Sequence, residues 1–247
     1  MKRAYVRFYA ELNDFLMPAK RKQAIAYDFD VSGSVKDMIE SLGVPHTEVD
    51  LISANSEPVD FAYRVQDGDR IAVYPLFRSL DISSVAHPRP RPLSDVLFVA
   101  DAHLGRLAAY LRMLGFDTLY RNDYQDEEVA RISADEKRIL LTRDRGLLKR
   151  TIVTRGYCLR ATDPSGQLVE VLRHFDLIPS ISPFRRCMHC NSLLQKTEKE
   201  LVSDRLLPQT KRHYHEFFIC PNCARIYWKG SHYRRMWRFI ESITASN

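Results

Sequence analysis

Short apolar runs alternate with helical patterns between residues 97 and 144, and this alternation constrains the fold more than any other feature of the sequence. The runs at 96–100, 118–120 and 139–141 predict strands. Apolar residues recur at steps of three and four between positions 104 and 114, which predicts a helix. Strands that alternate with helices pair in parallel through right-handed crossovers. We therefore expect an α/β core built on a parallel sheet.

Acidic residues lie at the ends of these predicted elements. Asp101 follows the first strand, Asp144 follows the third, and Asp126, Glu127 and Glu128 open the second helix, where the helix dipole favours carboxylates. The carboxyl ends of parallel strands face one crevice, in which ligands bind. We therefore expect Asp101 and Asp144 to lie close together.

Several carboxylates on one rim repel each other unless a cation lies between them. Oxygen ligands without a nearby Cys or His favour Mg²⁺ or Mn²⁺ over zinc. Such an ion suits phosphodiester hydrolysis, because it activates a water molecule and neutralises charge on the leaving oxygen. The alternative is that these side chains only cap strands and helices, and the spacing by itself does not decide between the two.

The same stretch resembles the RNase domain named after the C-terminal part of the mutator-seven exonuclease, a domain that is itself similar to PIN nucleases. The resemblance covers residues 97–176 and rests on three segments in order: DAHLGRLAAYLRMLGFDTLY, NDYQDEEVA and RILLTRDRGLL. It implies a metal-dependent RNase whose metal ligands are Asp101, an acid among positions 126–128, and Asp144. It also implies a fourth acid, for which Asp163 is the candidate.

Three further polar residues lie near these acids. Arg106 and Arg143 flank them and are candidates for phosphate contact, although a solvated surface position is the alternative for each. His103 occupies a position at which such domains vary, and we interpret it as non-catalytic.

The first 78 residues predict a separate domain with the pattern strand, strand, helix, strand, strand. Ala4, Val6 and Phe8 alternate as in a half-buried strand, and Ser34 is a plausible helix N-cap. The pattern indicates a ubiquitin-like β-grasp fold and resembles the small sulfur carriers of thiamine and molybdopterin synthesis. Those proteins end in Gly-Gly, whereas this chain continues into PLFRSLD. We interpret the domain as a docking module for a protein partner, with a purely structural role as the alternative.

Residues 79–95 predict a linker, because the alternating prolines at 88, 90 and 92 favour extended polyproline II. The PIN-like RNase domain is then expected at 96–183. No apolar run reaches membrane-spanning length, and the charged N-terminal residues do not resemble a secretory signal. We expect a cytoplasmic protein with no membrane association and with reduced thiols.

Residues 184–247 predict a zinc ribbon followed by a basic, aromatic C-terminal helix. Two CxxC motifs place Cys187, Cys190, Cys220 and Cys223 at zinc-ligand spacing, and four thiolates leave no open position for catalysis. A reducing compartment disfavours two disulfides. The βαβ pattern in which a thioredoxin-like redox motif is expected is missing around these cysteines. The long interval between the motifs predicts an extended hairpin. Alternative ligands are His189, His213, His215 and His232. The remaining cysteine, Cys158, is expected to be a buried, inert thiol.

The positive charge of the chain is concentrated in this last domain. From Arg185 onward there are 12 Lys or Arg and 5 Asp or Glu, a net charge of +7 against +6 for the whole chain. Cations can hold phosphates while aromatic rings stack unpaired bases, which favours single-stranded RNA as the partner. The alternative is that the rings pack the ribbon and the charges are solvated. The RNA-binding candidates are Lys211, Arg212, Tyr227, Trp228, Arg234 and Arg235.

The favoured hypothesis is therefore a metal-dependent RNase with a β-grasp module and a zinc ribbon that helps to bind RNA. One alternative is a catalytically silent RNA-binding adaptor. The other is a docking protein whose β-grasp domain recruits a partner enzyme.

Overall fold

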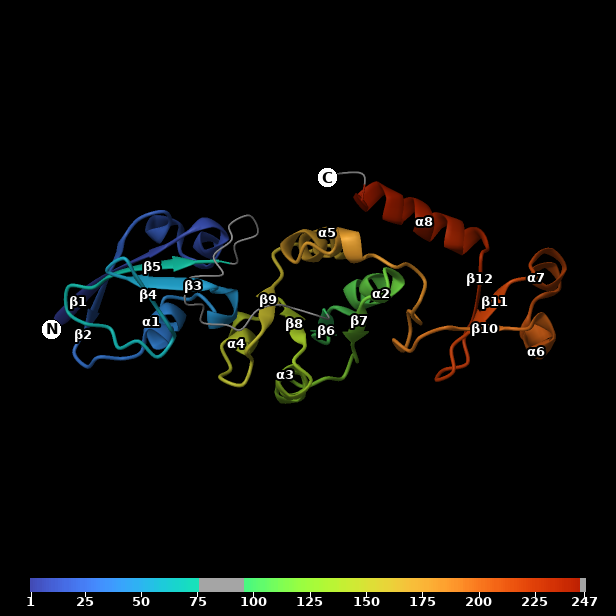
Figure 1. The fold of residues 1–247 in the computed structure, drawn as a ribbon, viewed down its shortest axis with the longest axis horizontal. Helices are drawn as coiled ribbons and strands as arrows, with labels where there is room; N and C mark the ends of the chain where they lie inside the picture. The colour runs from blue at the N-terminus through green and yellow to red at the C-terminus, as the bar shows by residue number, and fades with distance from the viewer. Residues whose placement is uncertain (76–95, 245–247) are drawn as a thin grey trace. The chain divides into compact units, whose positions relative to one another are not determined.

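The computed structural model describes residues 1–75 and 96–244 (Figure 1). The predicted linker at 79–95 lies outside these residues. The chain divides into two compact units, the first made of Met1–Asp95 with Asp126–Cys158 and the second of Val96–Gln125 with Leu159–Asn247.

The first unit begins with a five-stranded sheet in the order β2-β1-β5-β3-β4. Its strands are β1 (Lys2–Phe8), β2 (Ile25–Phe29), β3 (Leu51–Ala54), β4 (Glu57–Val59) and β5 (Arg70–Tyr74). The pair β1 and β5 is parallel, and the other neighbours are antiparallel. Short 3-10 helices lie at Ala10–Phe15, Pro18–Lys20 and His46–Glu48. This arrangement is the predicted β-grasp fold.

Helix α1 (Val35–Ser41) lies along this sheet (Figure 1) and begins where the sequence predicts. The Ser34 hydroxyl accepts a hydrogen bond from the Asp37 N–H at 3.1 Å, and the Asp37 carboxylate accepts one from the Ser34 N–H at 3.3 Å. This reciprocal capping box satisfies two N–H groups that the helix cannot pair internally. The core of this sheet is formed by Ala4, Val6, Phe8, Met38, Ile39, Ile52 and Val73.

The first unit also contains α3 (Asp126–Asp135), β8 (Ile139–Thr142), α4 (Arg145–Leu148) and β9 (Gly156–Cys158). The strands β8 and β9 pair in parallel, and every residue of β8 is buried. A continuous apolar run is typical of a strand that is covered on both faces. The third predicted strand of the core is thereby confirmed.

Buried polar side chains join the β-grasp sheet to the segment around β9. The Nε2 atom of His46 lies 2.8 Å from the carbonyl oxygen of Val153, and its Nδ1 atom lies 2.6 Å from Glu40 Oε1. The Glu48 carboxylate accepts a hydrogen bond from the backbone N–H of Cys158 at 2.6 Å. His46 and Glu48 are 6 % and 7 % exposed, so this junction is well packed. Cys158 is buried, as predicted.

The second unit contains β6 (Leu97–Ala100), α2 (Gly105–Met113), β7 (Asp117–Leu119) and α5 (Pro164–His174). The strands β6 and β7 are parallel, and α2 packs against α5 (Figure 1). Gly115 ends α2 with a φ of +98°, and a Cβ atom there would clash with the carbonyl oxygen of Ser182. The apolar face predicted for the helix is buried throughout: Leu104, Leu107, Ala108, Leu111 and Leu114.

The end of the second unit is a three-stranded antiparallel sheet in the order β10-β11-β12, followed by a long helix, α8. These elements are β10 (Gln195–Thr197), β11 (Phe217–Ile219), β12 (Ile226–Trp228) and α8 (Ser231–Thr244). The interval between the CxxC motifs is not the simple extended hairpin that its length suggested. It contains the short helices α6 (Lys199–Val202) and α7 (Pro208–His213) between β10 and β11.

Within residues 1–75 and 96–244, no helix combines the length and the apolar character needed to cross a bilayer.

Candidate functional site

The four cysteines of the CxxC motifs come together at the base of the ribbon. Their sulfur atoms all lie within 4.8 Å of one another. The Cys187–Cys223 and Cys190–Cys220 sulfur separations are 3.5 Å and 3.2 Å, much longer than a disulfide bond of about 2 Å. In a tetrahedral zinc site with Zn–S bonds of about 2.3 Å, the sulfurs are about 3.8 Å apart, so a small expansion would admit the ion. None of the four alternative histidines belongs to this group in the described residues.

The surroundings act in opposite directions on two of these thiols, because burial raises the pKa of Cys223 to about 12. The pKa of the Cys190 thiol is lowered to about 6, because hydrogen bonds from Ser192 and Cys220 outweigh the burial that would raise it. The hydroxyl of Tyr227 lies 3.1 Å from the Cys187 sulfur. A thiolate is the form of cysteine that binds metal. The four cysteines can therefore hold zinc as a closed, structural site.

The first CxxC motif is fixed to the α/β core by a buried arginine that the sequence analysis did not single out. Arg112 on α2 is 3 % exposed and donates through Nε to the carbonyl oxygen of Thr118 at 2.8 Å. Its terminal nitrogen donates to the carbonyl oxygens of Met188 and His189, inside the motif, at 3.2 and 2.7 Å. A buried charge needs such partners. The cysteine site and the core are therefore one packed structure within the second unit.

Asn191 and Arg186 form a second link between the motif and strand β7. The side chain of Asn191 donates to Asp117 Oδ1 at 2.8 Å and accepts from the Thr118 N–H at 3.0 Å. Arg186 lies 3.1 Å from the Asp117 carboxylate. Asn191 has a φ of +74°, a conformation that Asn tolerates better than most residues. The only feature of the sequence that draws attention to Asn191 is its position directly after a CxxC motif. Nothing in the sequence indicates which residues its side chain contacts.

Asp101 lies directly after β6 and is 8 % exposed. Its Oδ1 atom accepts a hydrogen bond from the Ala102 N–H at 2.6 Å, and its Oδ2 atom lies 3.3 Å from His103 Nδ1. A carboxylate at the end of a parallel strand is the arrangement that the sequence predicts. The sequence predicts no catalytic role for His103, and the structure places its ring within hydrogen-bonding distance of this carboxylate.

Asp126 and Glu127 occupy the first turn of α3, as predicted. Arg150 reaches toward both, with nitrogen–oxygen distances of 3.9 Å to each carboxylate. Both acids are well exposed, and such long, exposed ion pairs contribute little stability. Asp144 belongs to the same unit, but these three acids do not form a close group of ligand atoms in the described part of the chain.

Asp144 is exposed and caps the short helix α4. Its Oδ1 atom accepts hydrogen bonds from the N–H groups of Gly146 and Leu147 at 2.7 and 3.4 Å. No hydrogen bond to its Oδ2 atom is found among the described residues. The capping role that the sequence left open is therefore present, and it occupies only one of the two carboxylate oxygens.

Asp163 also caps a helix. Its Oδ1 atom accepts from the Ser165 hydroxyl at 2.6 Å and from the Gly166 N–H at 2.8 Å, at the start of α5. The hydrogen bond from Ser165 is the main reason that the pKa of Asp163 is below its ordinary value, and the one from Gly166 adds to the effect. Asp163 and Asp101 belong to the second unit, whereas Asp126, Glu127 and Asp144 belong to the first.

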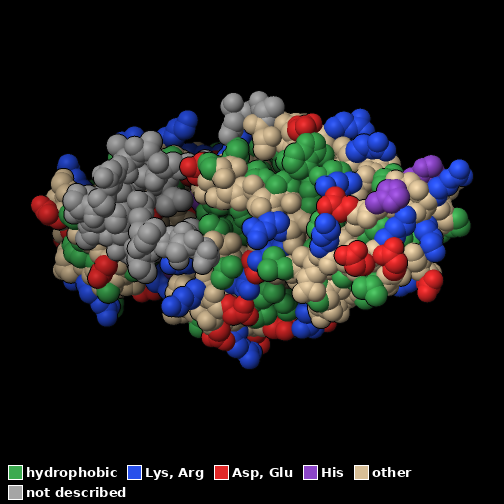
Figure 2. All heavy atoms as spheres, turned by 45° about the vertical axis from the view of Figure 1, so that its right-hand side comes forward, with side chains coloured by type: hydrophobic (Ala, Val, Ile, Leu, Met, Phe, Trp, Pro, Cys, Tyr) green, Lys and Arg blue, Asp and Glu red, His purple; other side chains and the backbone are tan. Residues whose placement is uncertain are grey.

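The predicted RNA-binding cations are all exposed. Arg106 lies on α2, Arg143 lies between β8 and α4, and the others lie on α7 and α8: Lys211, Arg212, Arg234 and Arg235. On the face that Figure 2 shows, Lys and Arg side chains are interspersed with Asp and Glu. Trp228 is 37 % exposed, whereas Tyr227 is half-buried against the cysteines. The aromatic residues therefore combine packing with exposed ring surface.

Taken together, these features define a class: a ubiquitin-like domain, an α/β core of parallel strand pairs with an aspartate after β6 and another after β8, and a four-cysteine ribbon joined to the core. Among known families, the model described as Mut7-C RNAse domain matches residues 96–240, and the model described as Mut7-C ubiquitin matches residues 1–81. The chain belongs to the Mut7-C RNAse domain family, and the resemblance found in the sequence is confirmed. No curated protein and no solved structure shows significant similarity to the chain.

Proposed function

We propose that this protein is a metal-dependent ribonuclease that hydrolyses RNA phosphodiester bonds. Membership of an RNase family is the observation that carries the proposal. The carboxylates support it, because Asp101 follows the parallel strand β6 and Asp144 follows the parallel strand β8. The carboxyl ends of parallel strands are where α/β folds place their ligands.

The residues suit a hard divalent cation such as Mg²⁺ or Mn²⁺, because each offers carboxylate oxygen. In this proposal Asp101 and Asp144 are the principal ligands, and Asp126, Glu127 and Asp163 complete the acidic site. When bound, such an ion activates water and offsets charge on the leaving oxygen.

Among the protein groups, the backbone N–H of Ala102 donates to Oδ1 of the buried Asp101 and fixes the orientation of this carboxylate. Arg106 and Arg143 are free of ion pairs to described residues and are assigned to phosphate contact. His103 orients Asp101 through the 3.3 Å contact.

The test is cleavage of labelled RNA and DNA by the purified chain with the metal varied. We expect cleavage of single-stranded RNA with Mg²⁺ or Mn²⁺, and loss of at least about a hundredfold in rate in Asp101→Asn and Asp144→Asn proteins. Asn retains an N-cap oxygen, so Asp144→Asn preserves the start of α4 while removing the charge. Cleavage that survives both substitutions in folded protein contradicts the proposal.

A catalytically silent RNA-binding adaptor is the second candidate, and the capping roles of Asp144 and Asp163 favour it. Both carboxylates are explained by helix starts without any metal. This alternative predicts salt-sensitive RNA binding with no cleavage under any metal. It also predicts that Asp101→Asn leaves RNA affinity unchanged or improves it, since a negative charge is removed.

For the ubiquitin-like domain we propose protein docking on the outer face of its sheet. There Tyr9 and Tyr74 stack with ring centroids 4.4 Å apart, and Tyr5 is 43 % exposed. Arg7 lies over the ring of Tyr9 at 5.2 Å. Exposed aromatic and arginine side chains are enriched where proteins bind proteins. A full-length Tyr5→Ser, Arg7→Ser protein that retains every partner bound by the wild type contradicts this assignment.

A further inference from the structure

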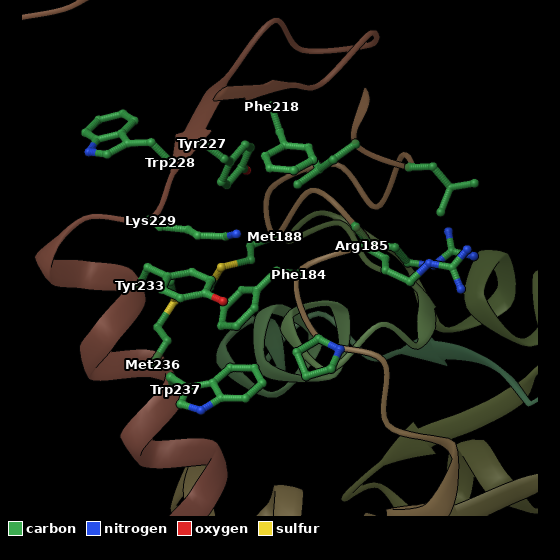
Figure 3. A pocket seen from close by; sticks show the side chains of 14 residues that line it. Phe184, Arg185, Met188, Phe218, Tyr227, Trp228, Lys229, Tyr233, Met236 and Trp237 are labelled. Carbon is green, nitrogen blue, oxygen red and sulfur yellow. The ribbon is translucent and has the colours of Figure 1, made fainter. Parts of the chain in front are cut away.

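A cavity of about 510 Å³ opens between the ribbon and helix α8 (Figure 3). Residues from three parts of the chain line it: the segment 183–194 around the first CxxC motif, the strands β11 and β12 with Lys229 after them, and the first turns of α8. It lies wholly within the second unit. The aromatic residues of its lining are Phe184, Phe218, Tyr227, Trp228, Tyr233 and Trp237.

Three of these rings lie against one another along one wall. Phe184 and Tyr233 have centroids 4.5 Å apart, and Tyr233 and Trp237 are nearly parallel, at 14° and 6.2 Å. Trp237 is still 39 % exposed. An exposed, oriented indole extends this group of rings toward solvent and offers a face on which another flat ring can stack.

Cations accompany the rings, and none of the residues that line the cavity is acidic. Arg185 is exposed and makes no ion pair with any described residue. Lys229 lies on the opposite side, where its ammonium group is 2.7 Å from Glu216. The free guanidinium of Arg185, on the side of the cavity away from Trp237, gives the edge of the site an affinity for an anion (Figure 3). This combination fits an aromatic base joined to a phosphate better than it fits an apolar peptide.

The cysteine site sets the position of one wall. Tyr227 contributes its ring to the cavity, while its hydroxyl lies 3.1 Å from the Cys187 sulfur. The ring is therefore tied to a metal-ligand residue and is not free to move into the slot.

We propose that this cavity binds one unpaired nucleobase of single-stranded RNA, stacked on Trp237, with a phosphate of the same strand held by Arg185. The proposal rests on the proposed function for its choice of RNA as the ligand, and it adds a base-binding site away from the carboxylates. Stacking on aromatic rings tolerates every base, so the site selects unpaired RNA over duplex without reading its sequence.

The chain supplies its own probe for this site, because both of its tryptophans, Trp228 and Trp237, line the cavity. The experiment uses the full chain carrying Asp144→Asn, without added magnesium or manganese, so that binding is measured in the absence of cleavage. A five-nucleotide single-stranded RNA is expected to quench tryptophan fluorescence. The same oligonucleotide with abasic positions is expected to bind without this quenching and about tenfold more weakly.

Two substitutions test the assigned contacts. Trp237→Leu is expected to weaken RNA binding about tenfold and Arg185→Ala about fivefold. Trp237→Phe retains a ring and is expected to restore most of the affinity, which separates stacking from a folding defect. Matched controls in the same ribbon are Tyr214→Leu and Lys196→Ala, both outside the cavity, and these are expected to change affinity less than about twofold.

The proposed base-binding site is contradicted if normal and abasic RNA bind equally well, or if Trp237→Leu leaves the affinity for RNA unchanged. Duplex RNA that quenches as well as single-stranded RNA also overturns it. This assay needs no catalysis, so it tests the base-binding cavity independently of the proposed nuclease activity. Quenching without cleavage in the wild type contradicts the nuclease alone, whereas cleavage without quenching contradicts the pocket alone.

Discussion

The side-chain oxygen of Asn191 accepts a hydrogen bond from the backbone N–H of Thr118 at 3.0 Å, so the residue after the first CxxC motif satisfies a backbone donor of strand β7. Thr118 is fully buried, and its N–H has no access to water as a substitute. The ribbon is therefore part of the structural support of the α/β core. The family model that spans residues 96–240 is consistent with this joint unit.

Asn191→Gly is expected to lower the free energy of unfolding by about 1–3 kcal/mol, because a buried N–H loses its acceptor. Glycine tolerates the positive φ at this position, so the substitution removes the side chain without adding backbone strain. Asn222→Gly, in the exposed part of the second CxxC motif, is the matched control. Denaturant unfolding of the two proteins measures the difference, and equal losses would show that the Asn191 side chain contributes nothing specific.

Arg112→Lys is expected to destabilise the protein by about 1–3 kcal/mol, because an ammonium group cannot reach three carbonyl oxygens as a guanidinium does. Arg106→Lys on the same helix is the control, since Arg106 is exposed. If zinc occupies the cysteines, Arg112→Lys should also speed its release to a chelator. Indistinguishable melting temperatures and release rates for the two variants would contradict a bridging role for Arg112.

The purified protein is expected to contain one zinc ion per chain, held by the four cysteines. Removing it should lower the thermal stability of the core, since the CxxC motif and β7 share hydrogen bonds. Elemental analysis and melting curves before and after chelation provide the measurement, with Cys220→Ser as the genetic equivalent. A protein that melts identically with and without the metal would show that the site is dispensable for the fold.

The free energy of unfolding is expected to depend on pH through Asp163. The hydrogen bonds to its carboxylate determine the direction of this dependence. Because its folded pKa is below the ordinary value of 3.8, the stabilisation is fully present above that value. It is lost as the pH falls through the folded pKa, since the unfolded state then binds the proton more readily. Asp163→Asn keeps a capping oxygen but does not titrate, so the stability difference between wild type and variant should shrink at acidic pH. Unfolding curves between neutral and acidic pH measure it, and a constant difference would refute the assignment.

Glu48→Leu is expected to cost about 1–3 kcal/mol of stability, because the backbone N–H of Cys158 would lose its carboxylate acceptor in a buried position. Glu48→Gln keeps an acceptor oxygen and should cost less. Urea unfolding of the full chain distinguishes the two. Equal losses would mean that the carboxylate stabilises the β-grasp junction through its charge and that a neutral acceptor oxygen contributes nothing.

Local pattern was enough to predict much of the fold. The alternation of Ala4, Val6 and Phe8, the cap at Ser34 and the apolar face of α2 depend on neighbours within a few residues, so their structure could be inferred directly. The spacing of the four cysteines was equally informative, because metal geometry restricts it. The short helices α6 and α7 were missed, since a polar interval between two knuckles carries no strong periodicity.

What the sequence determined by itself is most of the larger elements, the family and the available chemical groups: carboxylates after parallel strands, four thiols, and cations among aromatic rings. Only the tertiary structure decided that Arg112 and Asn191 join the first CxxC motif to the core, that His103 lies next to Asp101, and that Trp237 and Arg185 line one cavity. The physical reason is that periodicity and capping are local in the chain. Buried hydrogen bonds and ring stacking, in contrast, join residues that lie far apart in sequence and become neighbours only when the chain folds.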